Sequence, residues 1–472
     1  MSHPVLSPNP LMILPFGLLL GMIALAPLFF GGFWGRHYPK VAYGLGGITL
    51  GYYLLGLGAH GRVVHTGLEY VSFMALVGSL YVVAGGIHIR VKGEATPWGN
   101  VVFLGVGAVV ANVLGTTGAS MLLIRPWLRM NRYRVTEYHV VFFIFVVSNV
   151  GGCLTPIGDP PLFLGYLKGV PFWWVMKNCW GAWLAAVGLL LGMFWVVDYR
   201  NYLRAPKGVR EEQTREPEAW KFEGLGNVFF LTVILAAVFV DRPTFLREAL
   251  MVGAAVGSYF TTRKAVHEAN AFNFHPIKEV AILFAGIFAT MMPALDWLQG
   301  NAGKLGEPTV SLYYWGSGVL SSVLDNAPTY LSFLSAALGA KVAPEVVAQV
   351  QGLMQSGGVG MAGVSDGARM AYGVLEQYHG AALAAKTLGT EELQLAVLMG
   401  DPGLARFLVA ISLGAVFFGA NTYIGNGPNF MVKAIADQQE VKTPGFVGYV
   451  VRYAVPFMLP MLLVVWWFFV RS

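Results

Sequence analysis

The chain has 472 residues, of which 56% are hydrophobic and 12% are charged, against about 25% charged residues in a typical soluble domain. So few charges cannot cover a soluble protein of this size, and the composition excludes a soluble enzyme, a disordered chain and a disulfide scaffold. We therefore expect a multi-spanning α-helical membrane protein with the lipid bilayer as its partner. Its net charge of +6 reflects basic cytoplasmic loops, not nucleic-acid binding.

Apolar segments suited to crossing a bilayer follow one another along almost the whole chain. In chain order they are Leu11–Phe30, Val41–Leu57, Tyr70–Ile89, Val101–Leu128, Tyr138–Leu167, Trp173–Val197, Gly226–Val240, Phe245–Thr261, Ile277–Leu298, Val310–Leu338, Phe407–Ala436 and Phe446–Val470. Two polar stretches interrupt this series. Residues 198–225 are predicted to form a cytoplasmic loop, and residues 339–404 a helical insert outside the bilayer.

An internal repeat divides the chain. With a shift of 267 residues, Gly152–Phe163 matches Gly419–Phe430 at six of twelve positions. A shift of 210 residues aligns Val113-Leu114 with Val323-Leu324, and the difference between the shifts is close to the length of the polar insert. We therefore predict a first transmembrane repeat at residues 11–197 and a second at residues 226–470.

Each repeat contains two segments that cannot be continuous helix. Prolines and glycines interrupt the motif Thr155-Pro-Ile-Gly-Asp159 and its counterpart Thr422-Tyr-Ile-Gly-Asn426. The segments Gly115-Thr-Thr-Gly118 and Asp325-Asn-Ala-Pro328 lie within other long apolar stretches, and we interpret them as the tips of helical hairpins. Paired broken segments of this kind mark a binding site near the membrane midplane.

The distribution of basic residues predicts the topology. If the hairpins do not cross, each repeat crosses the membrane five times, so the second is inverted relative to the first. This arrangement places 19 of the 31 lysines and arginines on one face, which the positive-inside rule makes cytoplasmic. We expect a multi-pass protein of the cell (inner) membrane, with both termini and the insert extracytoplasmic.

The four breaks hold hydroxyls, amides and two carboxylates, but no lysine or arginine. Oxygen-rich, anionic surroundings suit Na⁺, and a buried carboxylate also exchanges protons. We predict a Na⁺ site at Asp325 and Asp159. The other candidates for ion or substrate binding are Asn326, Ser148, Asn149, Thr155, Asn112, Thr116, Thr117, Thr329, Asn421, Thr422 and Asn426.

Some of these residues also have a structural interpretation. Both aspartates precede prolines and could cap helices, and the hydroxyls and amides could satisfy broken backbone. Glu69 and Glu279 begin equivalent spans, where they could complement the helix dipole or couple transport to protons.

The motif Ser148-Asn-Val-Gly-Gly152 followed by Thr155-Pro-Ile-Gly-Asp159, paired with Val323-Leu-Asp325-Asn-Ala-Pro328, resembles the NhaD-like sodium/proton antiporters. These belong to the ion transporter superfamily, together with the citrate transporters, arsenite exporters and divalent-anion/sodium symporters. The resemblance implies inverted repeats with a re-entrant hairpin and a discontinuous helix in each, a scaffold domain, a homodimer and elevator-like alternating access. The site residues that it implies are Asp159, Asp325, Ser148, Asn149 and Asn326.

The leading hypothesis is a secondary active transporter that exchanges Na⁺ for H⁺, with no cofactor beyond these transported ions. The alternative is Na⁺- or H⁺-coupled transport of citrate or a dicarboxylate, in which Ser148, Asn149, Asn421 and Thr422 meet the carboxylate anion. An enzyme is not expected, because no HExxH, GxSxG or paired-histidine spacing lies in a span.

Overall fold

The computed structural model describes residues 7–90, 96–204, 221–240, 243, 245–306 and 308–471. Helices dominate these ranges. The strands found within them are β1 (His88–Arg90) and β2 (Lys221–Glu223), which pair antiparallel with His88 opposite Glu223.

The helices follow the predicted apolar segments. Those of the first half are α1 (Leu14–Phe29), α2 (Gly31–Gly51), α3 (His60–Gly85), α4 (Pro97–Met130), α5 (Glu137–Val146), α6 (Pro160–Lys168) and α7 (Trp174–Arg204). Those of the second half are α9 (Asn227–Ala237), α10 (Leu246–Thr261), α11 (Lys264–Ala269), α12 (His275–Asn301), α13 (Val310–Val323), α14 (Asn326–Lys341), α15 (Pro344–Ser356), α16 (Asp366–Ala384), α17 (Thr390–Gly400), α18 (Pro402–Phe418), α19 (Gly427–Gln438), α20 (Phe446–Tyr449) and α21 (Leu459–Val465).

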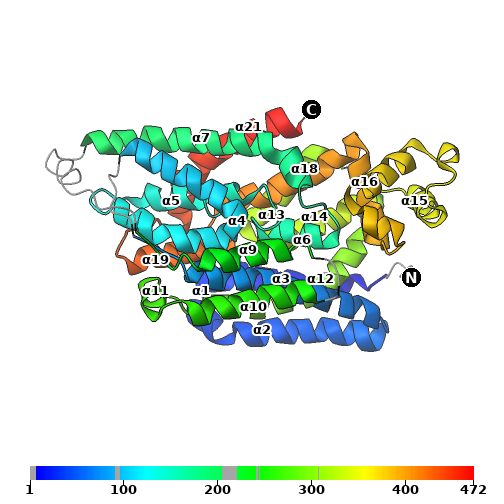
Figure 1. Ribbon diagram of the computed structural model, residues 1–472, viewed down its shortest axis with the longest axis horizontal. Helices are drawn as coiled ribbons and strands as arrows, with labels where there is room; N and C mark the ends of the chain where they lie inside the picture. The colour runs from blue at the N-terminus through cyan, green and yellow to red at the C-terminus, as the bar shows by residue number, and fades with distance from the viewer. Residues whose placement is uncertain are drawn as a thin grey trace.

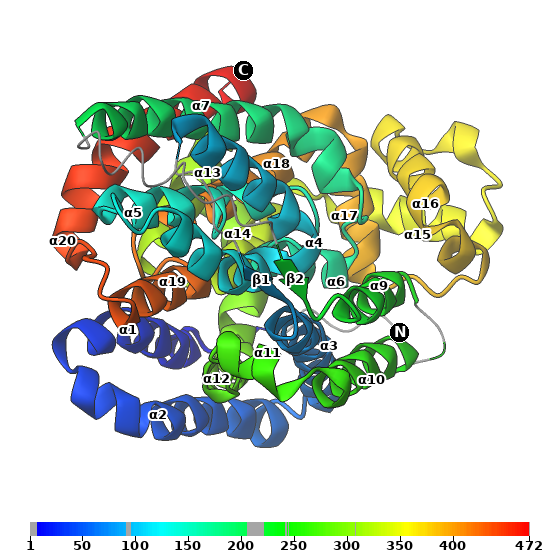
Figure 2. The ribbon, with the colours of Figure 1, turned by 60° about the vertical axis from the view of Figure 1, so that its left-hand side comes forward.

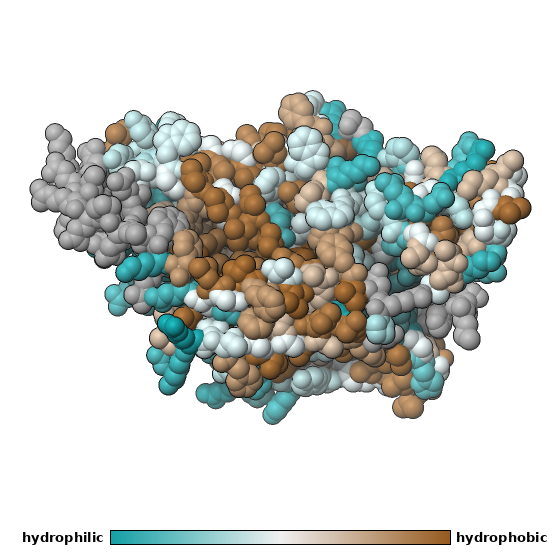
Figure 3. Space-filling model, in the orientation of Figure 1, coloured by the Kyte–Doolittle hydropathy of each residue, from teal (hydrophilic) through white to brown (hydrophobic). Residues whose placement is uncertain are grey.

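Seven helical segments of the described chain are long and apolar enough to cross a membrane. They are Pro10–Pro27, His60–Gly85, Pro97–Met130, Trp174–Arg204, His275–Lys304, Pro402–Asn421 and Phe446–Val470. An eighth results if α14 and α15, which are bent by 91° relative to each other, count as one span. Hydrophobic side chains gather across the middle of the molecule, while hydrophilic ones gather at the end formed by α15 and α16 (Figure 3). The prediction of an all-α polytopic membrane protein is confirmed.

The helices form layers (Figure 1). The continuous-helix layer consists of α1, α2, α3, α10 and α12, which lie together on one side of the molecule (Figure 2). The broken-helix layer consists of α4, α5, α6, α13, α14, α18 and α19, and α7 with the C-terminal helices covers its far side (Figure 1). The two layers touch where α3 packs against α4 and where α12 packs against α14.

The helices α15 and α16 lie at one end of the molecule, and α11 lies at the opposite end (Figure 1). Residues 339–404 contain α15, α16 and α17. The last of these helices, α17, is largely buried and is followed directly by α18.

The predicted boundary of the loop at residues 198–225 requires correction. Helix α7 continues to Arg204, and Asp198 is fully buried. Its carboxylate accepts hydrogen bonds from Asn100 (2.8 Å) and Tyr138 (2.7 Å) and forms an ion pair with Arg134. Because these partners compensate its charge, the helix does not end there. At the other end of the loop, residues 221–223 form β2, while residues 205–220 lie outside the described residues.

Candidate functional site

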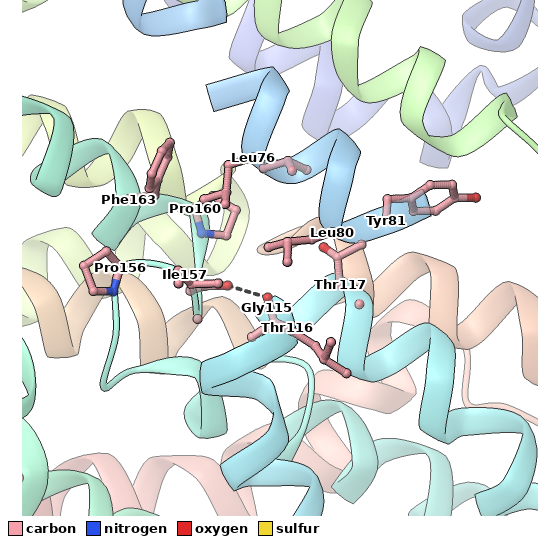
Figure 4. A pocket seen from close by; sticks show the side chains of 15 residues that line it. Leu76, Leu80, Tyr81, Gly115, Thr116, Thr117, Pro156, Ile157, Pro160 and Phe163 are labelled. Atoms are coloured by element: carbon pink, nitrogen blue, oxygen red, sulfur yellow. Dashed lines mark hydrogen bonds between the residues drawn. The ribbon is translucent and has the colours of Figure 1, made fainter. Parts of the chain in front are cut away.

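Helix α4 is interrupted near its middle at Gly115, whose φ is 73° and ψ 156°. A Cβ atom there would lie 3.1 Å from the carbonyl oxygen of Ile157, so both the space and the φ angle favour glycine. The next residue, Thr116, donates its backbone N–H to the carbonyl oxygen of Gly158 over 2.7 Å. The break in α4 therefore lies against the segment that precedes α6, and a new half-helix begins at Thr116 (Figure 4).

Polar side chains satisfy the irregular backbone between α5 and α6. Asn112 donates to the carbonyl oxygen of Gly151 (2.7 Å) and accepts from the N–H of Leu154 (2.9 Å). Thr155 donates its hydroxyl to the carbonyl oxygen of Asn112 (2.6 Å) and accepts from the N–H of Gly158 (3.1 Å). Both predicted residues thus bind backbone groups that would otherwise be buried without a partner.

The same pattern recurs between α18 and α19. Ser322 occupies the position 210 residues after Asn112, and Thr422 the position 267 residues after Thr155. Thr422 donates its hydroxyl to the carbonyl oxygen of Ser322 (2.5 Å) and accepts from the N–H of Gly425 (3.1 Å). Asn421 donates to the hydroxyl of Ser322 (2.9 Å), so these candidates also stabilise a helix break.

The breaks meet at the carboxylate of Asp159, which is 1% exposed. Its Oδ1 accepts from the hydroxyl of Thr116 (2.7 Å) and from the amide of Asn426 (3.0 Å). Its Oδ2 accepts from the amide of Asn326 (2.6 Å). Each donor comes from a different broken element and is neutral. Within the described residues, no lysine, arginine or histidine forms an ion pair with Asp159.

Helix N-termini converge on the same point. Asp159 is the N-cap of α6, Asn326 is the first residue of α14 and Asn426 is the N-cap of α19, while Thr116 begins the second half of α4. Because helix N-termini carry partial positive charge, together they stabilise a buried anionic group. This convergence compensates for the lack of a basic side chain paired with Asp159 in the described part of the chain.

A buried amide and hydroxyl cluster adjoins Asp159. Asn149 donates to the side-chain oxygen of Asn429 (2.7 Å) and accepts from Asn426 (3.2 Å). The hydroxyls of Ser148 and Ser120 share a hydrogen bond of 2.7 Å. Ser120 and Asn429 are among the hydroxyls and amides of the four breaks but not among the candidates for ion or substrate binding given above, although each lies about one helical turn after such a candidate.

Two features of this centre would accommodate a small ligand: an amide oxygen without a partner and a small cavity. The Oδ1 atom of Asn326 is buried and has no hydrogen-bond partner. A cavity of about 20 Å³, enough for a water molecule, is lined by Leu76 and Leu80 of α3, by Thr117 and by Asp159. Figure 4 shows Leu80 and Thr117 facing each other across it.

Asp325 has a different position from Asp159. Its carboxylate accepts from the N–H of Ala327 (3.0 Å), and its carbonyl oxygen accepts from the hydroxyl of Thr329 (2.9 Å). It is half-buried and caps α14, with no hydrogen bond to Asp159 in the described structure. The structure thus brings Asn326 into the centre and leaves Asp325 and Thr329 at its flank.

The two predicted glutamates do not join this centre. Glu69 of α3 is buried and forms an ion pair of 2.8 Å with Lys168, at the far end of α6 from Asp159. Glu279 is half-buried near the start of α12.

The chain matches one family over nearly its whole length. The family, described as "Putative citrate transport", covers residues 7–470, and no curated protein matches the chain. The match agrees with the resemblance at the broader level, that of a transporter of the citrate transporter type. The chain therefore belongs to the putative citrate transport family, and it is a membrane-embedded secondary transporter.

Proposed function

We propose that this transporter exchanges Na⁺ for H⁺ across the cell membrane, with Asp159 as the group that binds either ion. The observation that carries the proposal is the position of Asp159, which is buried where the helix breaks meet and, among the described residues, is held by neutral donors alone. A carboxylate in such a place binds a proton or a metal cation, and competition between the two is the basis of exchange.

The surroundings of Asp159 supply the oxygen ligands that Na⁺ requires. The hydroxyl of Thr116 is 2.7 Å from Oδ1 of Asp159, and the unpartnered Oδ1 of Asn326 belongs to the amide that contacts its Oδ2. Ser148 and Asn149 lie in the adjoining cluster. We assign Asp325 a supporting role, as a second carboxylate at the flank of the site.

We further propose that residues 11–197 and 226–470 are inverted repeats that alternately expose this centre. The hydrogen bonds around Asn112 and Ser322 support this interpretation because they recur at corresponding positions. Corresponding residues also meet: Asp159 contacts Asn426, which lies 267 residues later. Such contacts are expected close to the axis that relates the two halves, where transporters with inverted repeats bind their substrate.

The second candidate is Na⁺- or H⁺-coupled uptake of citrate or a dicarboxylate. Two observations favour it: the description of the family and the convergence of helix N-termini, which attract carboxylate groups in other transporters. In this case Asp159 binds the coupling ion, and Ser148 and Asn149 are the hydroxyl and amide closest to the anion.

Transport in proteoliposomes tests both candidates. With a pH gradient imposed, added Na⁺ is expected to dissipate the gradient without citrate. A gradient that persists, together with Na⁺- or H⁺-driven uptake of labelled citrate or succinate, would establish the second candidate instead. The absence of both activities would refute a cation-coupled site at Asp159.

We also propose that both termini and the insert face the outside of the cell (inner) membrane, and that the protein is a homodimer. Asn9, close to the first described residue, donates its backbone N–H to the hydroxyl of Tyr52 (3.0 Å), and residues 57–60 line a cavity together with Gly389 and Glu391 of the insert, which supports a common side. A tag placed in residues 339–404 should be accessible from outside intact cells. A tag that is labelled only after lysis would show the opposite orientation. Analytical ultracentrifugation in detergent should give the mass of two chains.

A further inference from the structure

A buried lysine at the end of α6 links three elements. Lys168 is 8% exposed, and its Nζ lies 2.8 Å from Oε1 of Glu69 and 3.0 Å from Oε2 of Glu391. Glu69 belongs to α3, and Glu391 to α17 of the insert. Because Asp159 is the N-cap of α6, Lys168 occupies the end of this helix opposite the candidate site.

The two carboxylates lie in different parts of the molecule. Helix α3 belongs to the continuous-helix layer, whereas α17 leads directly into α18 of the broken-helix layer. The insert is tied to the end of α6 by a second contact, between Nε2 of His379 and the carbonyl oxygen of Gly169 (3.2 Å). These contacts place the Lys168–Glu391 pair on the side of the broken-helix layer, and the Lys168–Glu69 pair crosses between the layers. Helix α17 also accepts one hydrogen bond from the continuous-helix layer, from the amide of Gln299 to Gln394 (2.8 Å).

We propose that the Lys168–Glu69 ion pair is a latch between the two layers, which opens in each transport cycle while Glu391 keeps Lys168 paired. The inference rests on the proposed function, because alternating access requires one bundle to move against the other. A buried charge that loses its only partner is strongly destabilising. Glu391 is a second carboxylate on the same side as Lys168, that of the broken-helix layer. The Lys168–Glu69 pair can therefore open without leaving the ammonium group of Lys168 unpaired.

The surroundings of the latch fit this role. A cavity of about 630 Å³ lies beside it, lined by Arg62 and Asp296 from the continuous-helix layer and by Glu391 and Glu392 from α17. Water in this space weakens the attraction between the charges once they begin to separate. Burial alone would raise the pKa of Glu391, but the cationic side chains of Lys168 and Arg62 outweigh it and lower the pKa, so Glu391 remains an ionised partner.

A neighbouring ion pair provides an internal comparison. Arg62 lies 3.0 Å from Asp296, whose carboxylate also accepts from the hydroxyl of Tyr53 (2.7 Å). Arg62 and Asp296 belong to α3 and α12, so this pair joins helices of the same layer. It lines the same cavity and is partly buried, but its loss should not release one layer from the other.

The test uses a cysteine that becomes accessible when the layers separate. Leu80 of α3 is buried against the break in α4, and Leu80→Cys in a chain with Cys153→Ser and Cys179→Ser gives a single reporter thiol. Its labelling by a membrane-impermeant maleimide is followed in proteoliposomes. We expect Glu69→Gln to raise the labelling rate above that of the parent. Glu69→Met should raise it further, to about ten times the parent rate, because methionine lacks the neutral hydrogen-bond acceptor that glutamine keeps for Lys168.

Two control variants separate the latch from a general loss of stability. Glu391→Gln leaves the crossing pair intact but removes the carboxylate that keeps Lys168 paired when this pair opens, so its labelling rate should fall below that of the parent while transport slows. Asp296→Asn should leave labelling unchanged. The proposal is overturned if both Glu69 variants label like the parent, or if either control raises labelling as much as they do. Labelling requires no transported ion, so a clear effect of Glu69 in a chain without Na⁺/H⁺ exchange would refute the proposed function and not the latch.

Discussion

Replacing Asp159 by asparagine removes the charge of the candidate site while keeping its shape. The carboxylate accepts three hydrogen bonds, from Thr116, Asn426 and Asn326. In Asp159→Asn, one carboxylate oxygen becomes an NH₂ group, which meets the donor amide of Asn326. Because Oδ1 of Asn326 has no partner, rotation of that amide turns the donor–donor contact into a hydrogen bond.

The expected changes in the free energy of unfolding and in Na⁺ affinity follow from these hydrogen bonds and from the lost charge. A hydrogen bond to a charged group contributes about 1.5–3 kcal/mol, but the substitution also relieves the burial of a charge that has no basic partner. We therefore expect the free energy of unfolding to change by no more than about 1 kcal/mol. A cation about 4 Å from the carboxylate gains about 4 kcal/mol at an effective dielectric constant of about 20, so Na⁺ affinity should fall by about a thousandfold.

The assay is the stabilisation of the purified protein by Na⁺. A ligand that binds only the folded state raises the melting temperature, and choline chloride at equal ionic strength serves as the control salt. Na⁺ should raise the melting temperature of the parent and of Asp437→Asn, which alters a carboxylate paired with Lys433 near the end of α19. It should not raise that of Asp159→Asn. Equal stabilisation of Asp159→Asn and the parent would refute the assignment.

Three further predictions concern Asp325, the break at Gly115 and the ion pair of Glu391. Asp325→Asn should keep the melting temperature, because asparagine caps helices as well as aspartate, but should slow exchange by about tenfold; Asp325→Ala should also lose about 1 kcal/mol of stability. Exchange at the parent rate in Asp325→Asn would show that Asp325 only caps α14. Gly115→Ala should destabilise by at least about 1 kcal/mol because of its positive φ and the nearby carbonyl of Ile157, whereas Gly188→Ala in α7, where nothing lies within 4 Å of a new Cβ, should be neutral or stabilising. Equal melting temperatures for the two alanine variants would contradict the strained break. The pKa of Glu391 is lowered, so its contribution to stability is complete above the ordinary value of 4.5 and declines as the pH falls through the lower folded-state value. The difference in melting temperature between the parent and Glu391→Gln should therefore be constant near neutral pH and shrink in acid, and a pH-independent difference would argue against the ion pair.

The sequence was sufficient to predict the breaks, because they depend on local chemistry. Prolines 156, 160 and 161 cannot donate to a helix, and a residue at the φ of Gly115 is strained unless it is glycine. The residues that satisfy broken backbone, such as Asn112 and Thr155, were recognisable for the same reason, since short polar side chains at a break bind nearby peptide groups.

The sequence could not distinguish the roles of the two aspartates. Asp159 and Asp325 both precede a proline-containing helix start, and both are N-caps in the structure. Only the packing of the broken elements determines that Asp159 points to the centre, while Asp325 bonds to the backbone of its own helix and its neighbour Asn326 reaches Asp159.

Buried ion pairs between distant segments could not be predicted from the sequence either. Lys168 meets Glu391 across 223 positions in the chain, and Asp198 meets Arg134 across 64. In a sequence such residues are charges near the ends of apolar segments, which is where solvated charges also occur. The expectation that Asp198 begins a loop was wrong for this reason.

The most direct test of the central claim, that Asp159 binds either a proton or Na⁺, is the release of protons when Na⁺ binds. The purified protein in weakly buffered detergent solution is titrated with NaCl, with choline chloride as the control, at several values between about pH 4 and pH 8. The account predicts that Na⁺ releases protons from the parent within part of this range and none from Asp159→Asn. Na⁺ binding without proton release at any pH, or equal release from Asp159→Asn, would contradict it.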